Sequence, residues 1–227
     1  MSVFVKICGI TNESDALLSV ALGADALGFI FAPSKRQVNE RIVSDIIHQL
    51  PGSVLTFGVF VNERPEEVAK LVNKIGLNGA QLHGNEGPTA TNFVSDRVRY
   101  VIKSFPAGHS QLRNLDAYRI WATLVDSSNP GSGSVFDWSL VEGMSPERRM
   151  LLAGGLNAEN VAVGIERVRP FGVDVASGVE ASLGKKDPAK LRAFIRNAKA
   201  VEFAETDFWQ RDSTFTEDMP YNWEESD

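Results

Sequence analysis

Short apolar segments alternate with amphipathic segments along most of the chain, and this repetition limits the folds that are open to it. Eight apolar runs occur, at positions 3–7, 25–31, 54–61, 80–82, 98–103, 120–125, 150–153 and 173–176. Most of these runs do not alternate with polar residues, which is typical of parallel strands that helices cover. Eight strand–helix units predict an α/β fold of the (β/α)8 TIM barrel type.

The alternative arrangement is a doubly wound open sheet. Such a sheet needs only five to seven strands, so it leaves the eighth apolar run without a place. We therefore predict one barrel domain over residues 1–200.

Several amphipathic segments indicate how the helices should begin and which face they should bury. Asp187-Pro188 predicts the start of the last helix, because a capping carboxylate precedes a first-turn proline. Asn157 is expected to cap a helix that ends near Val168, and a weaker helical pattern covers residues 110–118. Three predicted helices present an apolar face: Leu17, Val20 and Ala21; Ile42, Ile46 and Leu50; and Leu191, Phe194, Ile195 and Ala198.

Residues 201–227 do not fit the repeat and are expected to form a C-terminal extension. From Glu202 onward there are nine acidic residues and one basic residue, so this segment carries a charge of −8 and the rest of the chain is slightly basic, for a net charge of −6. Disordered tails are poor in aromatic residues, but this segment holds Phe203, Phe208, Trp209, Phe215, Tyr221 and Trp223. Two interpretations stay open: the aromatic side chains pack on the outside of the barrel, or they form a contact surface for self-association or for another partner.

Composition excludes several classes of function. No basic run or stripe appears, so we expect no nucleic-acid groove. No apolar run is long enough for a transmembrane helix, and the N-terminus does not resemble a signal peptide. The single cysteine fits a reducing compartment, so a cytoplasmic protein is expected. No metal-ligand spacing, GxGxxG motif or P-loop is present, so we expect neither a metal nor another cofactor.

A barrel of this type carries its active site where the strands end, and two residues there are candidates for acid–base chemistry. Cys8 follows the first apolar run and precedes Gly9, and Asp126 ends the sixth run. A lone cysteine is often a small buried hydrophobe, and an aspartate before Ser127 can instead cap a loop. The placement of both at strand ends favours an acid–base pair on different sides of the barrel mouth.

Two charged residues lie inside otherwise apolar runs. Lys6 is one pleat below Cys8 on the same face of its strand, and Asp174 lies on the eighth run, which adjoins the first in a closed barrel. A nearby cation favours the thiolate form of cysteine. We expect Lys6 to supply part of that charge and Asp174 to hold Lys6 in place.

Other strand ends suggest groups that bind a substrate. The Gly154-Gly155 and Ser177-Gly178 pairs follow the seventh and eighth runs, where barrel enzymes commonly hold a phosphate. Arg36 either is a solvated surface charge or lies over the mouth, where its planar fork suits a carboxylate. His83 either hydrogen-bonds locally or faces the pocket. These residues predict a phosphorylated small molecule as the substrate.

Taken together, the motifs resemble the phosphoribosylanthranilate isomerases of tryptophan biosynthesis. Each motif is weak alone, but their order over residues 3–199 is specific. The segments that carry the resemblance are residues 5–10, 23–29, 34–38, 58–62, 81–84, 125–127, 136–138, 152–156 and 173–180.

The resemblance implies a cofactor-free Amadori rearrangement of N-(5'-phosphoribosyl)anthranilate to 1-(2-carboxyphenylamino)-1-deoxyribulose 5-phosphate. By the family's pattern, Asp126 is the general acid that opens the ribose ring, and Cys8 is the general base that removes the C2' proton. Arg36 is expected to bind the anthranilate carboxylate, and the two small-residue turns the phosphate. The rival interpretations are an indole-glycerol phosphate synthase, which uses lysine and glutamate as its acid and base, and a silent barrel that serves as a binding module.

Overall fold

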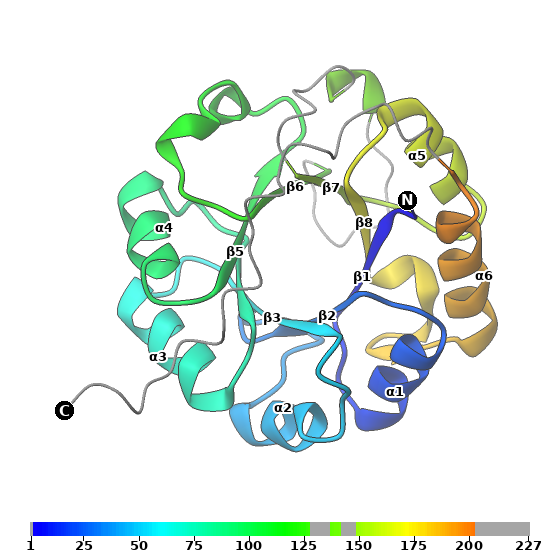
Figure 1. Ribbon diagram of the computed structural model, residues 1–227, viewed down its shortest axis with the longest axis horizontal. Coiled ribbons are helices and arrows are strands. Elements are labelled where there is room, and N and C mark those ends of the chain that lie inside the picture. The colour runs from blue at the N-terminus through cyan, green and yellow to red at the C-terminus, as the bar shows by residue number, and fades with distance from the viewer. Residues whose placement is uncertain (1, 128–136, 142–148, 203–227) are drawn as a thin grey trace.

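The computed structural model describes residues 2–127, 137–141 and 149–202, which form a closed barrel of parallel strands inside a ring of helices (Figure 1). The strands follow one another around the barrel in sequence order, and β8 closes it against β1. This topology confirms the predicted (β/α)8 barrel and excludes the open sheet. The strands are β1 Phe4–Cys8, β2 Ala26–Ile30, β3 Leu55–Phe60, β4 Gly79–Leu82, β5 Tyr100–Pro106, β6 Ala122–Asp126, β7 Met150–Leu152 and β8 Gly172–Val175.

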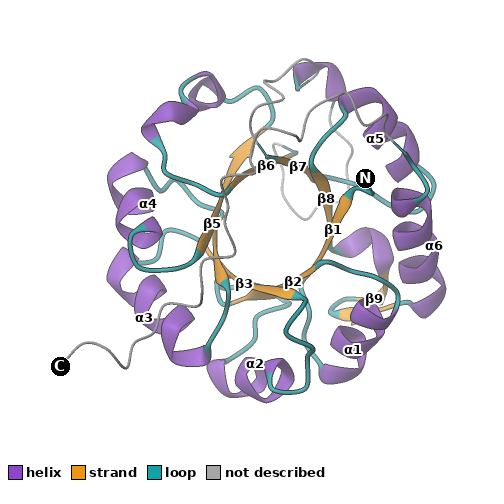
Figure 2. Cartoon of the chain, viewed as in Figure 1, coloured by secondary structure: helices purple, strands orange, loops and turns teal. Residues whose placement is uncertain are grey.

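The helices lie outside the strands, as Figure 2 shows by secondary structure. The α-helices in the described residues are α1 Glu13–Ala21, α2 Glu40–Ile47, α3 Pro65–Ile75, α4 Pro88–Ser95, α5 Val161–Val168 and α6 Pro188–Lys199. Between β5 and β6 the predicted weak helix is two short 3-10 helices, Ser110–Arg113 (η1) and Leu115–Ala117 (η2). Two further 3-10 helices are Trp138–Leu140 (η3) and Ser177–Val179 (η4).

Local sequence explains where two of these helices begin. Asp187 caps α6, because its carboxylate accepts the backbone N–H groups of Ala189 and Lys190. The prediction for α5 was wrong by one turn. Asn157 accepts the N–H groups of Glu159 and Asn160 and so closes a turn, and the helix starts only at Val161.

The predicted helix faces are confirmed for α6 and only partly for the first two helices. The four residues predicted for α6 are all buried. In α1 the buried residues are Ala16 and Ser19, and Leu17 is 39% exposed. In α2 the buried residues are Val43 and Ile46, and Ile42 is 39% exposed. In α1 small residues make the buried contact and the predicted Val20 packs partly against the core. In α2 the predicted Ile46 is buried, and Leu50, just after the helix, packs partly against the core, so the error there lies at Ile42.

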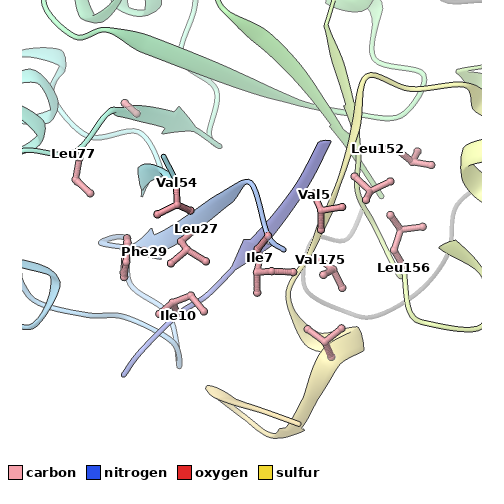
Figure 3. Close-up of a cluster of buried hydrophobic side chains, with 14 of the residues drawn as sticks. Val5, Ile7, Ile10, Leu27, Phe29, Val54, Leu77, Leu152, Leu156 and Val175 are labelled. Carbon is pink, nitrogen blue, oxygen red and sulfur yellow. The ribbon is translucent and has the colours of Figure 1, made fainter. Parts of the chain in front are cut away.

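The core has two layers, and the strands alternate between them. Val5, Ile7, Leu27 and Phe29 belong to the layer between strands and helices (Figure 3). The barrel interior holds a second cluster with Ala26, Phe57, Ile102, Ala122, Leu124, Leu151 and Ala153, against which Phe4 packs. Since Val5 and Ile7 face outward, the alternate residues Lys6 and Cys8 face the interior of the barrel.

A small antiparallel hairpin between η4 and α6 is absent from the sequence-based prediction. It consists of β9 Glu180–Ser182 and β10 Lys185–Lys186, with Gly184 in the left-handed conformation in the turn between them. The hairpin brings Glu180 and Lys186 together beside β1.

The predicted extension covers residues 201–227, and its residues from 203 onward lie outside the described part of the chain, so its boundaries and its contacts stay predictions. In the part of the chain that is described, no helix is both long and apolar enough to cross a membrane.

Candidate active site

All eight residues predicted for the site lie at the same end of the barrel. Cys8 and Asp126 are the last residues of β1 and β6, and the other six lie after β2, β4, β7 and β8. This is the end at which barrel enzymes of this type carry their active sites. The ends of β1 and β6 lie on different sides of the ring (Figure 2), so a small molecule between them can contact both.

Cys8 shares its side of the barrel with a buried ion pair. The Lys6 Nζ atom lies 2.7 Å from Oδ1 of Asp174, and the Lys6 side chain is completely buried. This contact confirms the predicted pair. Gly28 of the neighbouring strand has no side chain and so leaves room for both the thiol and the ammonium group. A Cβ atom there would lie 2.9 Å from both Cys8 Sγ and Lys6 Nζ. The ammonium group therefore extends from the ion pair toward the thiol.

The proton affinity of Cys8 reflects opposing effects. Burial raises the pKa of the thiol, and the charge of Asp174 raises it further, whereas Lys6 and Lys186 lower it. The net shift is upward because burial outweighs the two lysines, but Lys6 acts in the predicted direction, since its charge favours the thiolate. Burial also disfavours the charge of Lys6, but Asp174 and Cys8 outweigh burial and raise the pKa of Lys6. Lys6 therefore stays cationic and lowers the cost of removing the thiol proton.

Arg36 has a partner that the sequence-based prediction missed. Its Nε and Nη2 atoms lie 2.7 and 2.8 Å from the two carboxylate oxygens of Glu180, and its side chain is 13% exposed. The bond to Glu180 raises the pKa of Arg36, so the guanidinium is charged. The interpretation of Arg36 as a solvated surface charge is therefore wrong, and the planar fork is already held at the edge of the mouth.

Lys186 is the third charged residue in the cluster that Arg36 and Glu180 form. Its Nζ atom donates to the backbone carbonyls of Cys8 at 2.7 Å and Ala176 at 3.0 Å, and it lies 3.4 Å from Glu180 Oε1. Burial alone would raise the pKa of Glu180, but the bonds to Arg36 and the charge of Lys186 outweigh it and lower that pKa. Glu180 is therefore an anion between two cations.

Asp126 has different surroundings. Its Oδ1 atom accepts the N–H of Ser127 at 2.6 Å, and its Oδ2 atom lies 3.5 Å from Nε2 of His83. The Nδ1 atom of His83 lies 2.9 Å from the side-chain nitrogen of Gln81. Gln81, one pleat below His83, is buried, and its side-chain oxygen has no hydrogen-bond partner among the described residues. The predicted pocket residue His83 thus links Gln81 to the carboxyl group of Asp126.

A second buried ion pair supports the loop that carries His83. Lys103 Nζ lies 3.0 Å from Glu86 Oε2 and donates to the carbonyls of Leu82 and Gly84. Glu86 in turn accepts the N–H groups of Gly84 and Asn62. Lys103, like Lys6, is a charge inside an apolar strand, so the same signal could have identified it from the sequence.

The two small-residue turns are packed against the site and against each other. Gly154 and Gly155 have φ values of +80° and +67°, which favour glycine. A Cβ atom on Gly154 would lie 2.9 Å from Oδ1 of Asp126, and one on Gly178 would lie 1.9 Å from the carbonyl oxygen of Leu156. The turns after β7 and β8 therefore lie against each other beside Asp126. No three His, Cys, Asp or Glu side chains in the described ranges are arranged to hold a metal ion.

Comparison with known proteins places this architecture in one family. Residues 5–197 match the family model described as N-(5'phosphoribosyl)anthranilate (PRA) isomerase. The N-(5'-phosphoribosyl)anthranilate isomerase of Desulforudis audaxviator is 46% identical over 202 residues, which cover 86% of this chain and 97% of that protein. The crystal structure of phosphoribosyl anthranilate isomerase from Thermus thermophilus superposes with a TM-score of 0.80 at 40% identity, covering 86% and 97% of the two chains.

A further solved structure shows what a relative binds. It is a phosphoribosyl anthranilate isomerase in complex with reduced 1-(o-carboxyphenylamino)-1-deoxyribulose 5-phosphate, a phosphorylated small molecule. It is 43% identical, has a TM-score of 0.78, and is covered completely by 88% of this chain. From the family model, the relatives and the shared barrel, we conclude that this chain belongs to the phosphoribosylanthranilate isomerase family.

Proposed function

We propose that this protein converts N-(5'-phosphoribosyl)anthranilate to 1-(2-carboxyphenylamino)-1-deoxyribulose 5-phosphate by general acid–base catalysis, as a step of tryptophan biosynthesis. The observation that carries the proposal is the pair of proton-transfer groups at the ends of β1 and β6, Cys8 and Asp126. Family membership supports this reaction over an indole-glycerol phosphate synthase, and the intact pair argues against a silent barrel.

The first step opens the ribose ring. The carboxyl group of Asp126 gives a proton to the ring oxygen, the bond from that oxygen to C1' breaks, and the anthranilate nitrogen becomes part of a Schiff base. Asp126 is left as a carboxylate, which the N–H of Ser127 stabilises. The proton that Cys8 takes up in the second step balances the one that Asp126 gives, so proton exchange with water restores both groups between turnovers.

The second step moves a proton away from carbon. Cys8, as the thiolate, removes the C2' proton, and the electron pair of that C–H bond forms a C1'=C2' double bond as the Schiff base becomes an enolamine. Tautomerisation then gives the C2' ketone of the product and a proton on C1'. The change is an internal redox reaction, so it needs no external oxidant or reductant. The ammonium group of Lys6 stabilises the thiolate that acts as the base.

Binding groups flank these two residues. We assign the anthranilate carboxylate to Arg36, which is charged and held at the mouth. We assign the phosphate to the turns at Gly154-Gly155 and Ser177-Gly178, because the loops after the seventh and eighth strands are the usual phosphate position in this fold and small-residue turns present backbone N–H groups to an anion.

The loss of fluorescence of phosphoribosylanthranilate on mixing with the protein tests the proposal. Turnover by the wild-type chain is expected, and no turnover would contradict the isomerase assignment. Cytoplasmic location and self-association through residues 201–227 also stay predictions. Cell fractionation tests the first, and sedimentation over a range of protein concentrations tests the second.

A further inference from the structure

The carboxylate of Glu180 takes no part in the reaction scheme above, yet it is bound on both sides at the edge of the mouth. Its side chain is only 6% exposed. Arg36 contacts both of its oxygens on one side, and Lys186 approaches one of them on the other. Because burying charged groups costs free energy, a buried carboxylate with two cationic partners calls for a functional or structural explanation.

The geometry of the contact leaves half of the guanidinium available. Glu180 uses the Nε and Nη2 edge of Arg36. A guanidinium has a second edge, formed by Nη1 and the remaining N–H of Nη2, which suits another carboxylate in the same bidentate way. Among the described residues, no hydrogen-bond acceptor contacts that second edge.

The stem of Arg36 is fixed as well. A Cβ atom on Gly9 would lie 2.8 Å from Cδ of Arg36, so the side chain passes directly over the turn that follows Cys8. A freely rotating arginine loses considerable conformational entropy when it binds a ligand. Here that entropy is already lost before the substrate arrives.

Glu180 itself has a rigid anchor. The completely buried Lys186 joins Glu180 to the backbone carbonyls of Cys8 and Ala176, at the ends of β1 and β8. The three charged groups together carry one net positive charge, which one substrate carboxylate would neutralise.

We propose that Glu180 is a positioning residue for substrate recognition, which fixes Arg36 so that the free edge of its guanidinium receives the carboxylate of the aromatic amine. This inference rests on the proposed role of Arg36. It extends that role to specificity, because a site built to bind a carboxylate discriminates against analogues that lack the group.

A double-mutant cycle tests this coupling. The variants are Glu180→Gln, Arg36→Ala and the double variant, with kcat and KM measured for phosphoribosylanthranilate. Glu180→Gln should raise KM about tenfold with little change in kcat, as expected for the loss of a binding contact. In the Arg36→Ala background, the same change should have no further effect on KM. Glu180→Asp, which keeps the charge but shortens its reach, should give an intermediate KM and provides a milder variant if Glu180→Gln does not fold.

A matched control is Glu40→Gln. Glu40 also binds one cation with both carboxylate oxygens, Lys74, but on the outer surface of α2 and α3. This variant should leave KM unchanged.

Several outcomes would overturn the inference: an unchanged KM, a lower KM because Glu180 competes with the substrate for Arg36, or effects of the two substitutions that add independently. A loss confined to kcat would also overturn it, because it would place the effect of Glu180 at Cys8. Failure of the wild-type chain to turn over the substrate would instead contradict the proposed function, so the two failures are distinguishable.

Discussion

The two sides of the barrel mouth give their proposed proton-transfer groups different electrostatic surroundings. On the β1 and β8 side, Cys8 lies near Lys6 and Lys186, and both cations lower the pKa of the thiol against the upward effect of burial. On the β4 and β6 side, the side-chain partner of Asp126 is His83, and no lysine or arginine pairs with this carboxyl group in the described ranges.

This difference matches the two proton tasks. A nearby cation favours the deprotonated form, which a general base needs, whereas a general acid must keep its proton until the substrate arrives. The barrel separates the two environments by attaching them to strands on different sides of one ring. Substitutions on either side therefore test whether each environment serves its proposed proton task.

The largest effect expected on the β6 side comes from Asp126→Asn. The amide keeps the size of the side chain but cannot give a proton to the ring oxygen, so kcat should fall by about 10²–10⁴, the usual contribution of such a group. Steady-state kinetics with phosphoribosylanthranilate measure this change. A kcat within threefold of the wild type would show that the acid lies elsewhere.

On the opposite side, Lys6→Met should move the pH dependence of the reaction. Removing the cation raises the pKa of the Cys8 thiol, so the rising limb of kcat/KM against pH should shift to higher pH, by about one unit if the lost interaction is roughly 1.4 kcal/mol. The substitution also leaves Asp174 buried without its partner, so a loss of about 3–5 kcal/mol in the free energy of unfolding is expected.

Lys103→Met is the matched control, since it also breaks a buried lysine–carboxylate pair but on the β4 and β5 side. It should lower stability and leave the rising limb where it is. If the limb of Lys6→Met coincides with that of the wild type, Lys6 only supports the barrel and does not tune the thiol.

A smaller effect is expected from Gly28→Ala. The added methyl group would lie 2.9 Å from both the thiol and the ammonium group, so it should push the flexible ends of Cys8 and Lys6 apart. We expect kcat at neutral pH to fall up to about tenfold, with a stability loss of about 1 kcal/mol from overpacking. Gly52→Ala, where the added atom meets nothing within 4 Å, is the control. Equal kcat values for the two variants would contradict direct contact between Lys6 and Cys8.

The sequence was informative for residues whose type is unusual at their position in the chain. Lys6 and Asp174 stand out as charges in apolar strands, and strand alternation with barrel closure was enough to pair them. The residues at strand ends, such as Asp126, could be placed at the mouth because the parallel strands of a barrel all end on the same side.

The sequence was less informative where contacts join distant segments. Glu180 and Arg36 are 144 residues apart, and the hairpin that positions Glu180 depends on Gly184 and on contacts with β1. The link from Gln81 through His83 to Asp126 also crosses from β4 to β6. Neither arrangement follows from local periodicity, because each depends on how the strand ends are spaced around the finished ring.

The most direct test of the division between a base side and an acid side of the mouth is a comparison of Cys8→Ala with the wild type. Turnover is followed by the loss of phosphoribosylanthranilate fluorescence, and binding is measured with reduced 1-(o-carboxyphenylamino)-1-deoxyribulose 5-phosphate. We predict that kcat of Cys8→Ala falls by about 10²–10⁴ while the affinity for the reduced compound changes by less than about threefold, a small effect on the binding free energy. Full turnover by Cys8→Ala would contradict the assignment of Cys8 as the base and, with it, the division of the barrel mouth into a basic and an acidic side.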